Sequence, residues 1–224
     1  MTVESEEFLK FSNEINKYIS AHMLGMDLTV NTYDYNCMWE EIISNGIQVR
    51  AFPFEKTARR AISGMIVKDK HEITLAYNSN MSSKRKNFTI SHELIHSLYH
   101  LNDENNMFTD TKESLTYSLA DMLPEFQANI GASAILIPEP VLINELKNGT
   151  SPYHISNKYE ISEAALYMRL VQSMQGNFEA SYLAASKTAN KIMTGNSKRT
   201  ANTLAINLEK KNLFSNPFYE AICV

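Results

Sequence analysis

Two histidines and a glutamate stand close together in the middle of the chain, in the run His92-Glu93-Leu94-Ile95-His96. Residues four apart on an α-helix lie on the same face, one turn apart, so two imidazoles at these positions can bind one Zn²⁺. Glu93 lies about 100° further round such a helix, at the edge of that face. From there it can reach a metal-bound water and act as general base. The alternative interpretation is a pair of surface histidines, because this pattern also occurs on ordinary helices.

A catalytic zinc needs a third protein ligand and one open position. A histidine six residues after the second one is absent, because that position is Asn102. A carboxylate on a later helix is the remaining option, and Glu125 supplies one 29 residues after His96. Asn129 follows four residues later on the same helical face and can hold a ligand histidine by a hydrogen bond. The alternative interpretation of Glu125 is a first-turn acid that the helix dipole favours.

Three further side chains are candidates for supporting roles. His100 continues the column of His92 and His96 by one more turn. It either supports the metal site or is a helix-end histidine that faces the terminal carbonyls. Tyr99 and Tyr117 can stabilise a tetrahedral intermediate, and core packing is the alternative role for each.

The elements that must position these residues follow from the hydrophobic periodicity. Helices are predicted near residues 1–23, 35–45, 88–100, 121–137, 141–147, 152–159 and 163–174, with an amphipathic stretch around 204–213. Strands are predicted at 47–51, 61–67 and 72–77. The polar runs 82–87 and 103–114 are expected to be loops. We expect the strand at 72–77, the last one before the metal helix, to be the sheet edge that pairs with an extended substrate.

The composition is that of a globular protein, with 44% hydrophobic and 21% charged residues in a chain of 224. The net charge of −4 argues against binding of nucleic acid through the overall charge of the protein. Only Cys37 and Cys223 are present, which excludes a cysteine-based zinc site or a disulfide scaffold. The acidic start has no signal-peptide pattern, and no apolar run approaches the roughly 20 residues that span a bilayer. We therefore expect a cytoplasmic protein with no membrane partner and no direct DNA binding.

The order of the elements predicts an α+β fold that is mostly helical with a small three-stranded sheet. We expect two domains, with Pro138 and Pro140 closing the first. Residues 1–140 would hold the N-terminal helices, the sheet and the zinc-binding helices. Residues 141–224 would form a helical region.

Residues 155–170 have the rhythm of a helix-turn-helix. Lys158 and Arg169 are nearly balanced there by two glutamates, whereas a DNA-reading helix is normally more basic. Packing or substrate recognition is therefore favoured over DNA contact. The tail from 187 to 211 is basic, which is typical of a solvated face but can also orient a partner.

Taken together, these motifs resemble the ImmA/IrrE family of metallopeptidases. The resemblance is carried by the run Phe88–His96, by Glu125-x-x-Ala-Asn129 and by the apolar run into Ile137-Pro138. The approach to the motif is also similar, with a helix that ends at Gly46 and strands that follow it. The resemblance covers roughly residues 35–175.

The resemblance implies a zincin-like metallopeptidase core with a gluzincin-type site. By matching position, His92, His96 and Glu125 would be the zinc ligands, and Glu93 would be the catalytic acid and base. Larger members of the family add a C-terminal sensor domain, for which fewer than 50 residues remain after residue 175.

Members of this family often occur in phages and mobile elements, beside a helix-turn-helix repressor. The resemblance therefore implies a zinc endopeptidase whose partner is a specific protein, namely a transcriptional repressor that it cleaves. One alternative is a DNA-binding regulator with a vestigial metal site, which would use residues 151–175. Another is an antitoxin-like interaction protein with a purely structural zinc. An intact Glu93 argues against both, because a structural zinc has no use for a general base.

Overall fold

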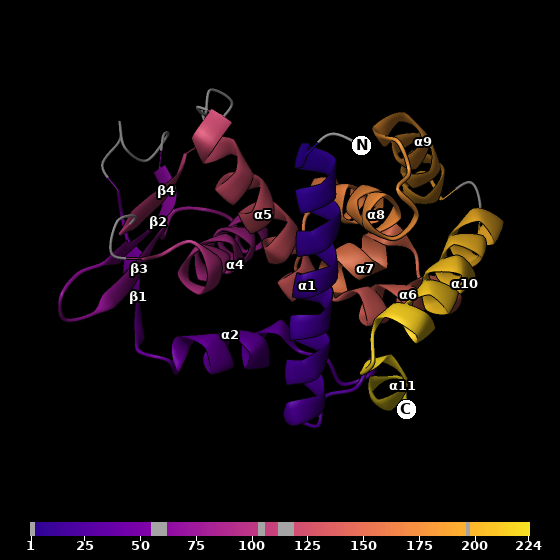
Figure 1. Ribbon diagram of the computed structural model, residues 1–224, viewed down its shortest axis with the longest axis horizontal. Coiled ribbons are helices and arrows are strands. Elements are labelled where there is room, and N and C mark those ends of the chain that lie inside the picture. The colour runs from indigo at the N-terminus through magenta and orange to yellow at the C-terminus, as the bar shows by residue number, and fades with distance from the viewer. Residues whose placement is uncertain (1–2, 55–61, 103–105, 112–118, 196–197) are drawn as a thin grey trace. The chain divides into compact units, whose positions relative to one another are not determined.

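The computed structural model of the protein describes residues 3–54, 62–102, 106–111, 119–195 and 198–224. Its contacts divide the chain into two compact units. The sheet unit is Asn36–Ala132, and the helical unit combines Met1–Tyr35 with Ser133–Val224. Figure 1 labels the elements of both units. This division by contacts does not test independent folding, so the predicted domains 1–140 and 141–224 stay a prediction.

The sheet unit contains a small mixed sheet of four described strands, one more than predicted. The strands are β1 (Ile47–Phe52), β2 (Ile62–Lys68), β3 (Ile73–Asn78) and β4 (Met107–Thr111). Their order in space is β1-β3-β2-β4. β1 pairs with β3 in parallel, and the other two neighbouring pairs are antiparallel. With the surrounding helices, this sheet confirms the predicted α+β class.

Two predictions about this sheet are wrong. The expected loop at 103–114 contains β4, because pairing with β2 gives backbone partners to a segment that has little hydrophobic alternation. The strand predicted at 72–77 is also not an edge, because β3 lies between β1 and β2. Of the described strands, β4 forms the sheet edge next to β2.

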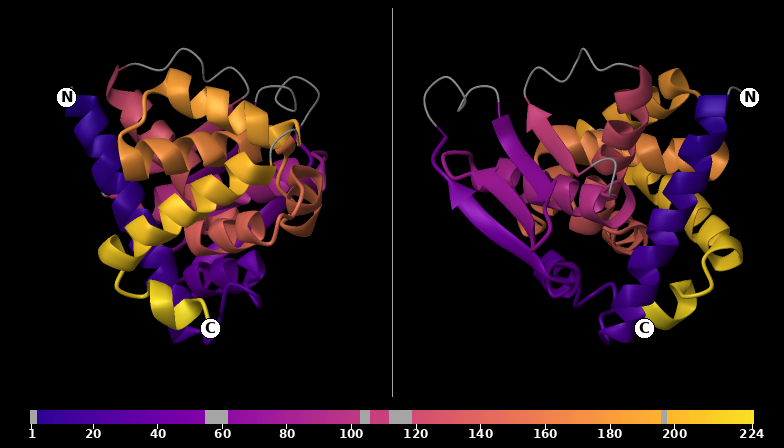
Figure 2. Two further views of the ribbon diagram at one scale, coloured as in Figure 1. Left: turned by 90° about the vertical axis from the view of Figure 1, so that its right-hand side faces the viewer. Right: turned by 60° about the vertical axis from the view of Figure 1, so that its left-hand side comes forward.

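Three of the described helices belong wholly or mostly to the sheet unit. They are α2 (Tyr35–Ile43), α4 (Ser83–Tyr99) and α5 (Leu119–Leu136). Helix α4 packs against β2, β3 and β4, as Figure 2 shows. The loop predicted at 82–87 is wrong, since α4 begins at Ser83 and takes in most of this basic run. Helix α5 can approach α4 closely because a Cβ on Gly131 would lie only 2.5 Å from Ile95.

The helical unit is built from α1 and the helices that follow α5. They are α1 (Val3–Gly25), α6 (Glu139–Lys147), α7 (Pro152–Lys158), α8 (Glu163–Phe178), α9 (Tyr182–Met193), α10 (Lys198–Ser215) and α11 (Tyr219–Ile222). The hydroxyls of Ser151 and Ser162 accept main-chain hydrogen bonds at the starts of α7 and α8, which confirms both predicted caps. Helix α9 was not predicted, although its buried residues Ala185, Ala189 and Ile192 do recur at helical spacing.

The core of the helical unit contains a buried polar cluster. Arg169 is fully buried and donates hydrogen bonds to a main-chain carbonyl (3.1 Å) and to Oδ1 of Asn16 (3.0 Å). Glu139 is also buried, and its two carboxylate oxygens accept from Asn177 (2.8 Å) and Asn212 (2.9 Å). Because Arg169 belongs to the segment with the helix-turn-helix rhythm, that segment uses one of its two basic residues for packing.

No described helix is both long and apolar enough to cross a bilayer by itself. Leu123–Leu136 and Glu139–Lys147 meet at a bend of 52° and pass by length and composition only when taken as a pair.

Candidate metal centre

Three buried side chains of the sheet unit converge on one point: His92 and His96 from α4, and Glu125 from α5. The Nε2 atoms of the two histidines are 3.1 Å apart. The carboxylate oxygens of Glu125 lie 3.2 Å from Nε2 of His92 and 3.3 Å from Nε2 of His96. Tetrahedral zinc, with ligands at 2.0–2.1 Å, holds donor atoms about 3.3 Å apart. The donor set and its spacing therefore fit zinc.

The position of Glu125 in its helix bears on the alternative interpretation of this residue. Helix α5 begins at Leu119, so Pro124 lies inside the helix and not in its first turn as predicted. Glu125 accordingly lies in the second turn, where attraction to the helix N-terminus has largely fallen off. Its contacts with the two histidines account for its burial better than the helix dipole does.

Each histidine of the group forms a hydrogen bond through Nδ1, the ring nitrogen that does not face Glu125. Nδ1 of His92 lies 3.2 Å from Oδ1 of Asn129, the partner expected from the sequence. Nδ1 of His96 lies 2.9 Å from Nδ1 of His100, whose Nε2 lies 2.9 Å from Oε1 of Gln127. The amide oxygens can only accept, so the protons follow from the network: His92 donates to Asn129, His96 to His100, and His100 to Gln127. In this arrangement both ligand histidines would present an unprotonated Nε2 to a metal, whereas without a metal an Nε2 that carries a proton donates it to Glu125.

The electrostatics of the group favour the forms that bind a metal. Burial opposes ionisation of Glu125, but the hydrogen bonds from His92 and His96 outweigh it and lower its pKa to about 2. Burial lowers the pKa of His96 to about 4, against the opposing effect of Glu125. Burial likewise lowers the pKa of His100. At neutral pH, Glu125 is therefore a carboxylate and His96 a neutral imidazole, which are the ligand forms that metal ions require.

Glu93 lies beside the group and is completely buried. Neither of its carboxylate oxygens has a hydrogen-bond partner of ordinary geometry among the described residues, and the main-chain amide of Asp110 is close enough only to affect its pKa. Burial, reinforced by the carboxylates of Asp110 and Glu125, raises its pKa well above the ordinary value, and the main-chain amide of Asp110 opposes this only weakly. An unpartnered buried polar group costs about 1–3 kcal/mol. The stability of the rest of the fold must offset this cost. Buried polar groups without partners are typical of functional sites.

Strand β2 is shaped around Glu93. A Cβ on Gly64 would lie 2.4 Å from the methyl group of Thr89 and 3.0 Å from Oε1 of Glu93. The strand can therefore approach α4 this closely only with glycine at this position.

Strand β4 completes the surroundings from the sheet edge. The ring of Phe108 stacks on the imidazole of His96, with centroids 4.3 Å apart. Asp110 is buried and accepts hydrogen bonds from Arg85 (3.0 Å) and from the hydroxyl of Thr89 (3.3 Å). The edge strand therefore runs directly past the three converging side chains.

Sequence reasoning missed four of these neighbours: Gly64, Phe108, Asp110 and Gln127. Phe108 and Asp110 lie in a segment that was expected to be a loop. A glycine in a predicted strand is a recognisable signal of close approach, and Gly64 is such a glycine. The role of Gln127 depends on His100, whose two interpretations the sequence left open. Of the two oxyanion candidates, Tyr99 is exposed at the end of α4, so the alternative role in core packing is wrong for it. Tyr117 lies outside the described residues.

Comparison with known families agrees with this geometry. The sequence profile of the peptidase M78 family, described as an IrrE N-terminal-like domain, matches residues 44–171. The match covers more than half of the chain and includes the converging side chains and Glu93. No curated protein matches the chain.

Proposed function

We propose that this chain, which belongs to the peptidase M78 family with its IrrE N-terminal-like domain, is a zinc-dependent endopeptidase. The observation that carries the proposal is Glu93, a completely buried carboxyl group without a hydrogen-bond partner among the described residues. It lies beside three side chains whose spacing fits zinc. A group that only stabilised the fold would be partnered, whereas a general base must keep an oxygen available for a proton.

In this proposal, His92, His96 and Glu125 hold the zinc and leave one coordination position open. The metal, when bound, supplies a Lewis acid that polarises a carbonyl group and activates water. Glu93 takes a proton from the attacking water and returns it to the leaving amine. Its raised pKa suits both steps, because a weakly acidic carboxyl group accepts a proton readily and can hold it until the amine needs it.

Strand β4 is the proposed docking edge for the substrate. It pairs with β2 on one side, and none of the described strands pairs with its other side. An extended peptide can add to such an edge through main-chain hydrogen bonds. The stacking of Phe108 on His96 would place that peptide next to the metal group. This assignment replaces the strand at 72–77, which lies inside the sheet.

The proposed substrate is a helix-turn-helix transcriptional repressor of a phage or mobile element, cleaved in the cytoplasm. This identity rests on the resemblance to the ImmA/IrrE family. The alternatives are a DNA-binding regulator or an antitoxin-like protein with a non-catalytic metal. The burial of Arg169 in the helix-turn-helix-like segment weighs against the first, and the unpartnered Glu93 weighs against both.

The test is hydrolysis by the purified full-length chain, loaded with zinc or stripped by a chelator. The substrates are casein and the transcriptional regulators encoded beside the gene, incubated in H₂¹⁸O and analysed by mass spectrometry. We expect zinc-dependent fragments whose new C-terminus carries ¹⁸O, which shows that water was the nucleophile.

The two substrates separate the two levels of the proposal. Cleavage of casein but of none of the regulators would support the peptidase activity and contradict the repressor as its substrate. Absence of zinc-dependent fragments from every substrate would contradict the peptidase activity itself.

A further inference from the structure

We propose that the helical unit carries a docking groove for an acidic amphipathic helix of a partner protein, formed by α8, α9 and α10. The inference is independent of the proposed peptidase activity, because all residues that line the groove belong to the helical unit. It concerns which protein the chain binds, and it holds whether or not that protein is cleaved.

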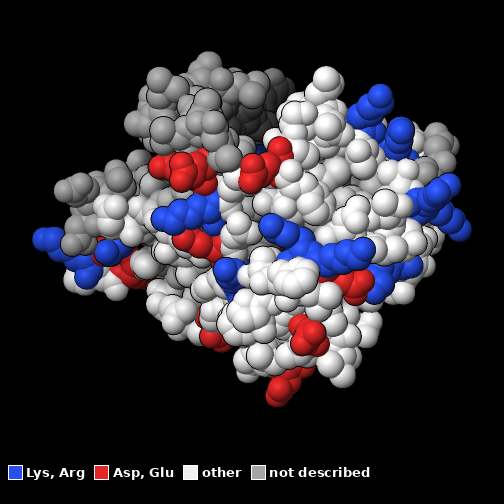
Figure 3. Space-filling model, turned by 45° about the vertical axis from the view of Figure 1, so that its right-hand side comes forward, with Lys and Arg blue, Asp and Glu red and all other residues white. Residues whose placement is uncertain are grey.

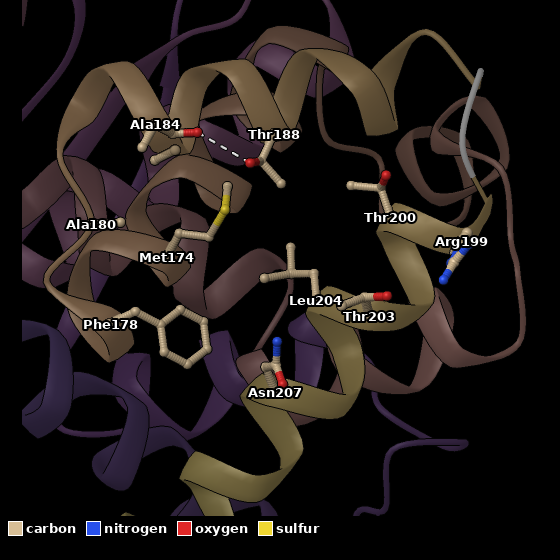
Figure 4. Close-up of a pocket in the computed structure, with 11 residues that line it drawn as sticks. Met174, Phe178, Ala180, Ala184, Thr188, Arg199, Thr200, Thr203, Leu204 and Asn207 are labelled. Carbon is tan, nitrogen blue, oxygen red and sulfur yellow. Dashed lines mark hydrogen bonds between the residues drawn. The ribbon is translucent and has the colours of Figure 1, made fainter.

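The groove consists of two adjoining hollows that share Phe178 and Asn207. Their volumes are about 370 and 430 Å³. Figure 4 shows Met174 of α8, Thr188 of α9 and Leu204 of α10 pointing into the first hollow from three sides. The second hollow continues along α10. A cleft between helices with apolar side chains at its base is a common binding site for an amphipathic helix.

The length of the groove also fits a helix. The α10 residues that line it recur at a spacing of three or four, on one face of the helix. They are Arg199, Thr200, Thr203, Leu204, Asn207, Lys210, Lys211 and Phe214. This face runs over four turns and is about 22 Å long at 1.5 Å per residue. A small molecule would fill one hollow, whereas a partner helix of similar length would use both.

The charge of the groove predicts the charge of its occupant. Residues 178–215 contain six lysines and arginines and two acids, Glu179 and Glu209. Glu209 is already bound to Lys147 at 2.7 Å. The described residues that line the two hollows include Arg199, Lys210 and Lys211 but no acidic side chain. Figure 3 shows lysine and arginine side chains gathered where α9 and α10 come forward. This basic rim lies on a chain whose net charge is −4, so an acidic partner is favoured.

Two exposed aromatic rings supply the apolar anchors. Phe214 is 93% exposed and Phe178 is 41% exposed, and both border the second hollow. Exposed aromatic side chains in a concave, basic setting are typical of the centre of a protein interface.

Nucleic acid and lipid surfaces fit this groove less well. A duplex would use the basic rim but would leave the apolar base of the hollows unfilled, since its outer surface is phosphate. An anionic membrane is flat on the scale of one helix, so it would contact a convex face and not a cleft between three helices. An acidic amphipathic helix uses the base and the rim at the same time.

The proposal is tested with synthetic fluorescent peptides and the full-length chain. One peptide is a 14-residue helix with leucines at a spacing of three and four and glutamates at its flanks, and a second has lysines in place of the glutamates. We expect the acidic peptide to bind by fluorescence anisotropy, more weakly as salt rises, and the basic peptide not to bind. The double change Lys210→Glu/Lys211→Glu should weaken binding about tenfold. Phe214→Ala should weaken it by a similar factor.

The matched control is Lys10→Glu/Lys17→Glu, which changes the net charge equally at two exposed lysines of α1 that line neither hollow. It should bind the acidic peptide as the wild type does. All substituted side chains are exposed, and circular dichroism melting checks that the variants fold. Equal binding by the groove variant and the wild type, or no binding of the acidic peptide, overturns the proposal. Binding of duplex DNA or of phosphatidylserine vesicles, lost in the groove variant and without peptide binding, overturns it in favour of that other partner.

Discussion

Two buried glutamates, one in each unit, are in opposite situations. Glu139 in the helical unit is 2% exposed, and its oxygens accept hydrogen bonds from Asn177 and Asn212. Its charge also offsets that of the buried Arg169, whose pKa is lowered by burial and raised by Glu139. Glu93 in the sheet unit is 0% exposed and has no hydrogen-bond partner among the described residues.

The difference separates a structural acid from a functional one. Each carboxylate oxygen of Glu139 accepts a hydrogen bond, so this residue links the helices that surround it. Glu93 lies beside two other carboxylates, which raise its pKa, and among the described residues only the main-chain amide of Asp110 lowers it. Burial alone therefore does not identify a chemical role. Single unpartnered atoms such as Nη1 of Arg169 occur in the structural cluster as well, whereas Glu93 has both oxygens unpartnered and lies beside the converging metal ligands.

The same substitution at both positions should change the free energy of unfolding by very different amounts. Glu139→Gln removes the charge that offsets Arg169 and turns an acceptor into a donor facing the Asn amides. We expect it to lower the free energy of unfolding by about 3–5 kcal/mol. Glu93→Gln in the zinc-free protein removes a group without partners and should change it by less than about 0.5 kcal/mol, or raise it. Urea denaturation of both variants measures the two values. Equal losses would mean that Glu93 is a structural acid after all.

Because the pKa of His96 is low, the zinc-free chain should lose folding stability in mild acid. The pKa of His96 is about 4 in the folded protein, against an ordinary value of 6.5 for a solvent-exposed histidine. As pH falls from about 6.5 to 4, the unfolded chain takes up this proton and the folded chain does not. Stability should therefore be lost over this window, by about 3 kcal/mol from His96 alone.

The contribution of His96 is isolated by His96→Gln, whose stability should depend less steeply on pH in this window. Gln48→Ala, at an exposed side chain that does not titrate, is the control and should follow the wild type. A His96→Gln curve that is parallel to the wild type would contradict the assigned proton affinity.

Removal of the Glu125 carboxylate should lower the affinity for zinc. Partners of metal ligands are worth about 10–100-fold in affinity, and a ligand itself is worth at least the upper end of that range. We expect Glu125→Ala to weaken zinc binding at least about 100-fold in competition with a chromophoric chelator. Glu40→Ala, at an exposed glutamate of α2, should leave the affinity unchanged. Unchanged zinc affinity in Glu125→Ala would remove Glu125 from the ligand set.

The smallest effect concerns the chain of hydrogen bonds behind His96. His100→Phe removes the acceptor for Nδ1 of His96 and keeps a ring of similar size. We expect zinc affinity to fall about tenfold, because the tautomer and orientation of His96 are no longer fixed. Gln127→Ala should have a weaker effect in the same direction. If His100→Phe binds zinc as tightly as the wild type, His100 serves only as the end of α4.

Much of the fold was predictable because most helices and strands are specified by the residue pattern within their own segment. The helical periodicities, the serine caps at 151 and 162 and the first three strands all follow from local residue types. Strand β4 does not, because Met107–Thr111 has too few apolar residues to specify a strand and depends on pairing with β2. The position of β3 was misjudged because chain order does not fix spatial order: β1 adds in parallel to the outer side of β3.

The residues of the metal group were predictable from spacing, whereas their surroundings were not. Helical geometry alone places His92 and His96 together, and Glu125 and Asn129 lie on one face of the next helix. Asp110 and Phe108 reach the site through strand pairing between distant segments. The absence of partners around Glu93 among the described residues is a property of the packed core, and no sequence pattern reports it.

The central claim is that Glu93 performs chemistry and does not hold the metal. The most direct measurement compares wild type and Glu93→Gln, each with its zinc content determined on the same sample, for the rate at which they cleave the protein substrate. We expect equal zinc content and a rate that falls about 10²–10⁴-fold, because Gln cannot accept a proton from water or return one to the amine. A zinc-loaded Glu93→Gln protein that cleaves as fast as the wild type would contradict the account.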